Sequence, residues 1–451
     1  MCLSAAACSQ GPEERPPNIV FILVDDLGVG DLSCYGQTRW QTPRLDRMAD
    51  EGMRFTAAYA GSTVCAPSRA ALLTGFHTGR LHMRGNGKVA LRPDPLDVTI
   101  ATRLRGLGYA TAMVGKSSVA CNSADAELPH AKGFDEFYGI LAHAAAHRHY
   151  PRTIVANAET IALDGNEGFT GAQYASELFV DRAIEWMAER SADRPFFLHL
   201  SITAPHADLI APERFVAPFR GRWPETPHTT SGYYHQAEPL AAYAGMVSFV
   251  DDSVGRVLDA LTELGIDEDT VVFFASDNGP HGEGGADPDA LDSNGSLRGG
   301  KRAMFEGGIR TPQIVRWPGR IAPGSTSDLP TAFWDFPATA LELAAGGPLE
   351  ETDGLSIVPT LLADGSPQRE HAYLYWEFHE QGGKQAVRMG EWKGIRRNVR
   401  ARSDRPIELY HLPTDPGERS DVAEDHPAVV ARIEAAMAEA HEPSDRFRWG
   451  K

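Results

Sequence analysis

Asn18-Ile19-Val20-Phe21-Ile22-Leu23-Val24-Asp25-Asp26 is the stretch that decides the fold. Its six consecutive apolar residues, 19–24, predict a strand buried on both faces, which is typical of a parallel sheet with helices on each side. A helical period over 243–261 predicts a long amphipathic helix. Strands alternating with helices predict an α/β sandwich, in which a large mixed or parallel sheet is flanked by helices. Three further strands are expected at 111–115, 195–202 and 271–276.

The pattern changes near Asp353. Downstream segments are short, alternate in polarity and end at turns, which indicates a smaller antiparallel sheet, and 428–440 is expected to form a closing helix. We therefore predict a leader or tether at 1–16, a catalytic domain at 17–352 and a C-terminal subdomain at 353–451. The strands expected in that subdomain lie at 372–378, 385–389, 392–396 and 408–410.

Composition indicates a soluble globular protein, with 451 residues, 42% apolar and 23% charged. No apolar run reaches the length of about 18 residues that a transmembrane helix needs. The net charge of −18 argues against a general nucleic-acid binder, although it leaves room for an anionic substrate held by local cations. Five cysteines are too few and too scattered for a disulfide framework, and they lack zinc-site spacing.

The N-terminal residues 3–11 look like the tail of a bacterial lipoprotein signal, in which small residues precede Cys8. The positively charged and long apolar regions of such a signal are missing, so a chance alanine-rich leader is the alternative. We favour a lipid anchor at Cys8. This predicts a periplasmic, outer-membrane-attached or secreted protein of a bacterium.

Polar side chains follow two of the expected strands. Asp25 and Asp26 come directly after the first, and Asp277 and Asn278 follow the last. Ligands in such sheets bind beyond the carboxyl ends of strands, and Ca²⁺ prefers carboxylate and amide oxygens. Alone, an Asp at this place could cap a helix, and Asp-Asn-Gly is a common turn. Together they make a site for a hard cation plausible.

Five candidate cationic residues stand in distinctive contexts. Lys116 and His206 each come at or after a strand end, and Lys301 and Arg310 lie in segments rich in glycine, which lets the backbone approach a ligand closely. Arg69 lies in Cys65-Ala66-Pro67-Ser68-Arg69, which by itself could be an ordinary helix start.

Taken in order, these segments resemble a family S1 sulfatase of the arylsulfatase A-like type, within the alkaline phosphatase superfamily. The stretch 65–69 matches the Cys-type signature of that family, and the resemblance extends from residue 17 to about 422. Chance is very unlikely to produce so many ordered motifs. The other matching segments are 17–26, 108–116, 133–135, 204–206, 276–279, 298–312 and 415–418.

The resemblance implies a reaction. Cys65 would be oxidised by a formylglycine-generating enzyme, and the hydrated formylglycine would attack sulfur. Asp25, Asp26, Asp277 and Asn278 would hold Ca²⁺, which also contacts the formylglycine at Cys65.

The resemblance also implies roles for the positively charged and histidine side chains. Arg69 and Lys116 would orient the nucleophile and offset negative charge. Lys301 and His206 would bind the sulfate, and one of the two would protonate the leaving oxygen.

One position departs from the family. The family usually continues Gly-Lys with Trp-His-Leu-Gly, whereas this chain places Ser118 where that histidine is expected. The family's histidine contacts the formylglycine and is proposed to help eliminate sulfate afterwards. Three explanations stay open: His147 or His149 supplies the proton transfer, water does so more slowly, or the protein is impaired. We favour impairment least, because the other catalytic positions are intact.

The sequence says less about the rest of the substrate. We expect substrate contacts from His281, which begins a glycine-rich loop, and from Arg310, His147, His149 and Trp376. For the loop the alternative is a flexible turn, and for Trp376 it is packing between subdomains. A sulfated carbohydrate is the favoured substrate. A phosphoester or phosphonate hydrolase of the same superfamily and a catalytically silent glycan-binding homologue are the alternatives.

Overall fold

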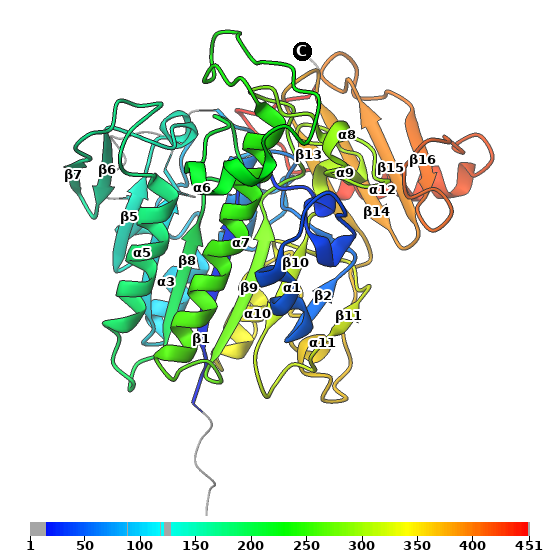
Figure 1. The fold of residues 1–451 in the computed structure, drawn as a ribbon. Coiled ribbons are helices and arrows are strands. Elements are labelled where there is room, and N and C mark those ends of the chain that lie inside the picture. Colours follow the sequence, from blue (N-terminus) through cyan, green and yellow to red (C-terminus); the bar gives the residue numbers. More distant parts are fainter. Residues whose placement is uncertain (1–14, 88, 118, 121–127, 450–451) are drawn as a thin grey trace, which may run out of the picture.

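A ten-stranded mixed sheet forms the centre of the computed structural model, which describes residues 15–87, 89–117, 119–120 and 128–449 (Figure 1). Residues 1–14 of the predicted leader, Cys8 among them, lie outside these residues. The strand order is β11-β2-β10-β9-β1-β8-β4-β5-β6-β7. In chain order these strands are β1 Asn18–Val24, β2 Met53–Phe55, β4 Ala110–Lys116, β5 Glu136–Ile140, β6 Thr153–Ala156, β7 Glu159–Ala162, β8 Phe196–Ser201, β9 Thr270–Ser276, β10 Gln313–Arg316 and β11 Ser325–Ser327.

Strand β1 lies in the middle of this sheet and pairs in parallel with β8 and β9. Its side chains alternate between two separate hydrophobic cores. Phe21 belongs to one core and Ile22 to the other, and both are buried. The predicted strand with two buried faces is therefore confirmed.

Helices cover both faces of the sheet (Figure 1). Helices α1, α5 and α7 contribute to the core on one face, and α2, α3 and α10 to the core on the other. The α/β sandwich and the long helix before β9 are thereby confirmed. The bounds are α1 Pro43–Asp50, α2 Cys65–Thr74, α3 Ile100–Gly106, α4 Leu128–Ala131, α5 Ala175–Ala188, α6 Glu213–Val216, α7 Pro239–Glu263, α8 Pro288–Leu291, α9 Glu306–Ile309, α10 Asp335–Leu343 and α11 Val358–Leu362. A small pair of strands, β3 Ala58–Tyr59 and β12 Thr331–Ala332, is separate from the large sheet.

The C-terminal part forms a four-stranded antiparallel sheet, in the order β13-β14-β15-β16, with α12 packed against it. This confirms the predicted small sheet and closing helix; a domain boundary at 353 stays a prediction. No helix in the described part of the chain is long and apolar enough to cross a membrane. The bounds are β13 Leu374–Phe378, β14 Lys384–Met389, β15 Trp392–Arg397, β16 Ile407–His411 and α12 Pro427–Ala440.

A buried charge cluster joins the two sheets. Lys393 of β15 reaches Glu306 Oε1 at 2.8 Å and Glu418 Oε1 at 3.2 Å, and all three side chains are inaccessible to solvent. Burial raises the pKa of Glu418 to about 7, although Lys393 opposes the shift. Because Glu306 begins α9, the cluster anchors the end of the loop that carries Lys301 to the C-terminal sheet.

Candidate active site

Four neighbouring parallel strands end at one edge of the large sheet and position the predicted polar residues there. In sheet order these strands are β9, β1, β8 and β4. Asp277 follows β9, Asp25 follows β1, His206 lies beyond β8, and Lys116 is the last residue of β4. The structure therefore brings together residues that are up to about 250 positions apart in sequence, at the edge where parallel sheets bind ligands.

Gly115 allows β4 to approach β8 closely enough to place Lys116. Its φ of +110° is unfavourable for other residues, and a Cβ at this position would lie 1.9 Å from the carbonyl oxygen of Ser201. The lysine side chain then extends to Asp25, with Nζ 2.5 Å from Oδ2.

The acidic residues form one compact, buried group. Asp277 Oδ1 accepts the backbone N–H of Asp26 at 3.1 Å, and Asp26 Oδ1 accepts from Asn278 Nδ2 at 2.6 Å. The buried Asn278 Oδ1 has no hydrogen-bond partner among the described residues. Burial and the nearby charge of Asp25 raise the pKa of Asp277 to about 7. Crowded oxygens of this kind, one of them unsatisfied, suit a hard cation.

Cys65 is the first residue of α2 and is completely buried beside this group. Its Sγ lies 3.3 Å from Asp25 Oδ1, and ligand atoms of Cys65, Asp25, Asp26 and His206 all lie within 4.8 Å of one another. Burial and the charge of Asp25 raise the pKa of the thiol well above its usual value. An unmodified Cys65 is therefore a poor thiolate nucleophile.

Arg69 lies one helical turn further along α2 and crosses the acidic group from behind. Its Nε donates to Asp277 Oδ2 at 2.7 Å, Nη2 lies 3.7 Å from Asp25 Oδ2, and Nη1 donates to Ser201 Oγ. The guanidinium is fully buried, so it holds two of the acidic side chains in place and partly neutralises them.

Lys301 contacts the same acidic group through Asp26. Its Nζ donates to Asp26 Oδ2 at 2.6 Å, to His206 Nε2 at 2.9 Å and to Glu283 Oε2 at 3.1 Å. Burial alone would lower the pKa of Lys301, but Asp26 and Glu283 raise it above its usual value. The ammonium therefore stays charged at neutral pH.

The contacts of His206 fix its tautomer. Nδ1 faces the carbonyl oxygen of Ala207, which can only accept, so the ring proton is on Nδ1. Nε2 is then the acceptor for Lys301, and burial together with Lys301 lowers the pKa of His206 well below 6.5. The ammonium of Lys301 therefore lies beside an unprotonated His206 Nε2, which also lies 3.3 Å from Asp26 Oδ2.

The predicted histidines differ in position. His147, at the end of the short 3₁₀-helix His143–His147, stacks on His206 with ring centroids 4.1 Å apart, and His281 stacks on the other side at 5.6 Å. His149 is fully buried behind the site, where Nε2 contacts the carbonyl oxygen of His206 at 2.8 Å. His147 and His281 therefore border the site, whereas His149 supports the backbone of His206. Ser118 lies outside the described residues.

Two further residues predicted to bind substrate lie elsewhere. Trp376 is fully buried, donates Nε1–H to the carbonyl oxygen of Ala60 at 2.9 Å and packs on Tyr59 and Trp334. Arg310 donates to the carbonyl oxygen of Thr56. The prediction of substrate contacts for Trp376, like that for His149, is corrected, because these side chains present no surface to a substrate. Packing in the core, the alternative interpretation, describes Trp376.

Sequence reasoning missed two residues of the site. Glu283 forms an ion pair with Lys301, and the Ser201 hydroxyl accepts a hydrogen bond from the Arg69 guanidinium. Glu283 lies in the glycine-rich loop that His281 begins, and Ser201 is the last residue of β8, so position relative to strand ends and glycines was the available signal.

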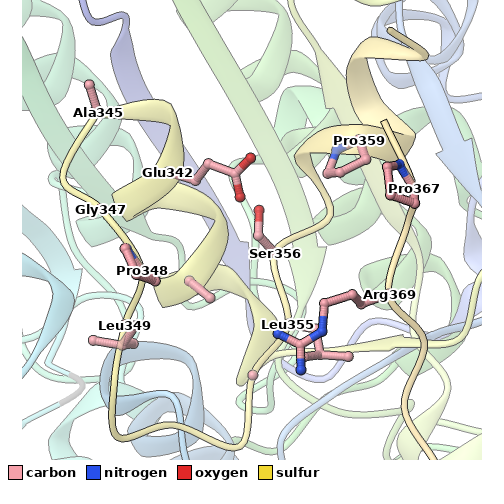
Figure 2. A pocket seen from close by; sticks show the side chains of 12 residues that line it. Glu342, Ala345, Gly347, Pro348, Leu349, Leu355, Ser356, Pro359, Pro367 and Arg369 are labelled. Carbon is pink, nitrogen blue, oxygen red and sulfur yellow. The ribbon is translucent and has the colours of Figure 1, made fainter. Parts of the chain in front are cut away.

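A separate cavity of about 540 Å³ lies beside α10 and α11. Figure 2 shows the carboxylate of Glu342 and the hydroxyl of Ser356 pointing toward one another among the residues that line this cavity, which include Arg369. None of the residues that line it belongs to the acidic site.

A doubly covered sheet, with a cation-lined acidic site at its strand ends, defines a hydrolase fold of the alkaline phosphatase superfamily. The sulfatase family model matches residues 17–347, and the model of the N-sulphoglucosamine sulphohydrolase C-terminal region matches 299–442. The chain belongs to the sulfatase family and is a sulfuric ester hydrolase.

Individual relatives agree with this assignment. Human arylsulfatase A is 32% identical, with 90% of this chain and 83% of that protein covered. The N-acetylgalactosamine-6-sulfatase of Canis lupus familiaris is 31% identical, with 93% and 84% covered. Ps i-CgsB, solved in complex with k-i-k-neocarrahexaose, is 25% identical and covers 97% of this chain and 95% of its own, with a TM-score of 0.81.

Proposed function

We propose that this sulfatase removes sulfate from a carbohydrate, with a formylglycine made from Cys65 as its nucleophile and Ca²⁺ as its metal. The observation that carries the proposal is the position of Cys65. Its side chain lies at the start of a helix, within hydrogen-bonding distance of Asp25 and in a ring of buried charges. A helix N-terminus favours the negative charge that a sulfate ester brings.

The acidic group fits a calcium ion. Asp25, Asp26 and Asp277 offer carboxylate oxygens, and Asn278 offers a buried amide oxygen that has no other described partner. All of these donors are oxygen, which Ca²⁺ prefers.

When present, formylglycine supplies a hydroxyl that attacks sulfur, and Ca²⁺ polarises the sulfate. The described residues supply the charge stabilisation and the proton transfer. Lys116, held by Asp25, contributes a fixed positive charge beside position 65. Lys301 holds the proton that the leaving oxygen needs, while His206 accepts from Lys301 and keeps it oriented. Because these groups are buried and paired, their charges need little rearrangement during the reaction.

His147 is our candidate for the group that acts where the family has a histidine at position 118. It stacks directly on His206, whereas His149 is engaged behind it. Burial and the charge of Lys116 lower the pKa of His147 to about 3, so its ring is neutral at physiological pH.

A sulfated carbohydrate is supported by relatives whose names refer to sugar sulfates or whose structures hold an oligosaccharide. A phosphonate monoester hydrolase shares the fold at 22% identity, which says nothing about substrate. A location in the periplasm or at the outer membrane rests only on the sequence of residues 3–11.

Peptide mass spectrometry around Cys65 tests the nucleophile, with protein co-expressed with a formylglycine-generating enzyme. We expect the mass of the aldehyde or its hydrate. An unmodified thiol in protein that nevertheless releases sulfate would refute the mechanism. Sulfate release from a panel of sulfated oligosaccharides, compared with the matching phosphate esters, tests the substrate.

A further inference from the structure

A basic pocket opens beside Lys301, on the side of the site formed by the C-terminal sheet. It has a volume of about 320 Å³, and no Asp or Glu is among the residues that line it. Such a lining is unexpected in a protein with a net charge of −18. We define the basic pocket by its full set of lining residues: Lys301, Arg302, Ala303, Met304, Phe305, Gln381, Lys384, Ile395 and Arg397.

The cations of the basic pocket differ in how well they are neutralised. Arg302 pairs with Glu283 at 2.7 Å, and Arg397 pairs with Glu408. Lys384 has no carboxylate within ion-pairing distance among the described residues. Its Nζ donates to the carbonyl oxygen of Arg302 at 2.6 Å and to Gln381 Oε1 at 3.0 Å.

The environment of Lys384 is electropositive. Burial, and then the charges of Arg397 and Arg302, lower the pKa of Lys384 below its usual value, although the charge of Glu380 opposes the shift. A half-buried ammonium next to two guanidinium groups is destabilised by repulsion between like charges. An anion bound among them would offset this repulsion and form charged hydrogen bonds with them. The ammonium nitrogen of Lys384 also lies over the ring of Phe378, 5.3 Å from its centre, and this cation–π contact holds it at the wall of the pocket.

We propose that the basic pocket binds a second anionic group of the substrate, beside the sulfate that is hydrolysed. The inference rests on the proposed function and narrows it to glycans that carry another sulfate ester or a uronate carboxylate. Lys301 forms part of both the catalytic site and the pocket wall, so an anion in the pocket belongs to the same sugar or to its neighbour. Planar guanidinium groups suit either anion, because both present paired oxygens.

Measurements of kcat/KM with matched disaccharides test whether the basic pocket binds a second anionic group. Three substrates carry the same scissile sulfate and differ in the second group: a neutral hydroxymethyl, a carboxylate or a second sulfate. The wild-type enzyme should give a higher kcat/KM for one or both acidic substrates than for the neutral one. Lys384→Gln should reduce this preference about tenfold, since a hydrogen bond to a charged group is lost. The acidic substrate whose advantage over the neutral one falls in Lys384→Gln identifies the anion as a carboxylate or a sulfate.

Two variants control for structural effects. Lys384→Arg should keep most of the preference, because it keeps the charge. Arg402→Gln, at an exposed arginine that pairs with Asp404, should leave the preference unchanged. If the wild type showed no preference, or if Lys384→Gln slowed all three substrates equally, Lys384 would be a support for the Lys301 loop and the proposal would be overturned.

Binding separates this proposal from the proposed function. Calorimetric titration of a Cys65→Ala protein with the same disaccharides needs no turnover. Tighter binding of the acidic sugars that Lys384→Gln abolishes would support the pocket even if no sulfate ester were hydrolysed. Equal binding of neutral and acidic sugars would overturn it even if sulfatase activity were established.

Discussion

In the proposed mechanism Lys301 supplies the proton that leaves with the alcohol, so replacing Lys301 and replacing His206 should affect two substrates in different ways. Lys301→Met removes the only described group that both faces His206 Nε2 and carries a proton to donate. His206→Asn leaves the ammonium in place, held by Asp26 and Glu283 at 2.6 and 3.1 Å. Both changes weaken sulfate binding, but only the first removes the acid.

The size of the effect depends on the leaving group. General acid catalysis contributes about 10²–10⁴-fold when the leaving alcohol is poor, as a sugar hydroxyl is. A nitrophenolate leaves without a proton. We therefore expect Lys301→Met to lower kcat about 10²-fold on nitrophenyl sulfate, through lost charge stabilisation, and by at least a further 10²-fold on a sugar sulfate. His206→Asn should lower both rates by a similar factor.

The assay is kcat on both substrates for the wild type and each variant, with thermal unfolding as a check that each variant is folded. A larger loss on the sugar sulfate for His206→Asn than for Lys301→Met would refute the assignment. It would mean that the histidine is the acid and that its proton lies on Nε2 during the reaction.

Four other changes probe the metal, the core, the family departure and the charge cluster. Chelation should abolish sulfate release and lower the melting temperature, with Ca²⁺ restoring both better than Mg²⁺, whose stricter octahedral geometry fits a crowded carboxylate group poorly. Trp376→Ala should cost about 3–5 kcal/mol in urea unfolding, and a loss of substrate affinity at unchanged stability would contradict its place in the core. Ser118→His should leave turnover unchanged or raise it; a collapse would show that the serine has a role of its own. Glu418 has a folded pKa of about 7 against 4.5 unfolded, so it takes up a proton on folding and its stabilising contribution is lost as pH rises through that window. Glu418→Gln should therefore be more stable than the wild type at pH 8, by at most about 3 kcal/mol, and should lose this advantage below pH 5; equal stability at both pH values would contradict the cluster.

The sequence was most informative where a segment is buried on both faces. An unbroken apolar run such as β1 leaves few alternatives, and polar residues that follow such runs must meet at one edge of a parallel sheet. The metal-site prediction followed from that geometry. Strands β5, β6 and β7, toward one edge of the sheet, and the antiparallel β10 were not predicted, because strands of four or five residues are too short to show a distinctive pattern.

The direction in which individual side chains point could not be predicted from the pattern of apolar residues. His147 and His149 are two residues apart, and only the fold shows that one stacks on His206 while the other lies behind it. Trp376 is in a strand that is buried throughout, so a sequence cannot tell a stacking platform from a core residue. The basic pocket is assembled from three separate segments, around 301–305, 381–384 and 395–397, which nothing in the sequence connects.

The complete burial of Cys65 has a consequence for the order of events in the cell. An oxidising enzyme must reach the Cβ of this residue, and in the folded chain no atom of it is accessible. If Cys65 is modified as proposed, the enzyme would therefore have to act before folding is complete, while the helix at 65–74 is not yet packed against the sheet. The pairing of β1 with β9 joins segments about 250 residues apart, and such distant contacts form slowly. The slow formation of these long-range contacts would leave time for the modification of Cys65 that the proposed mechanism requires.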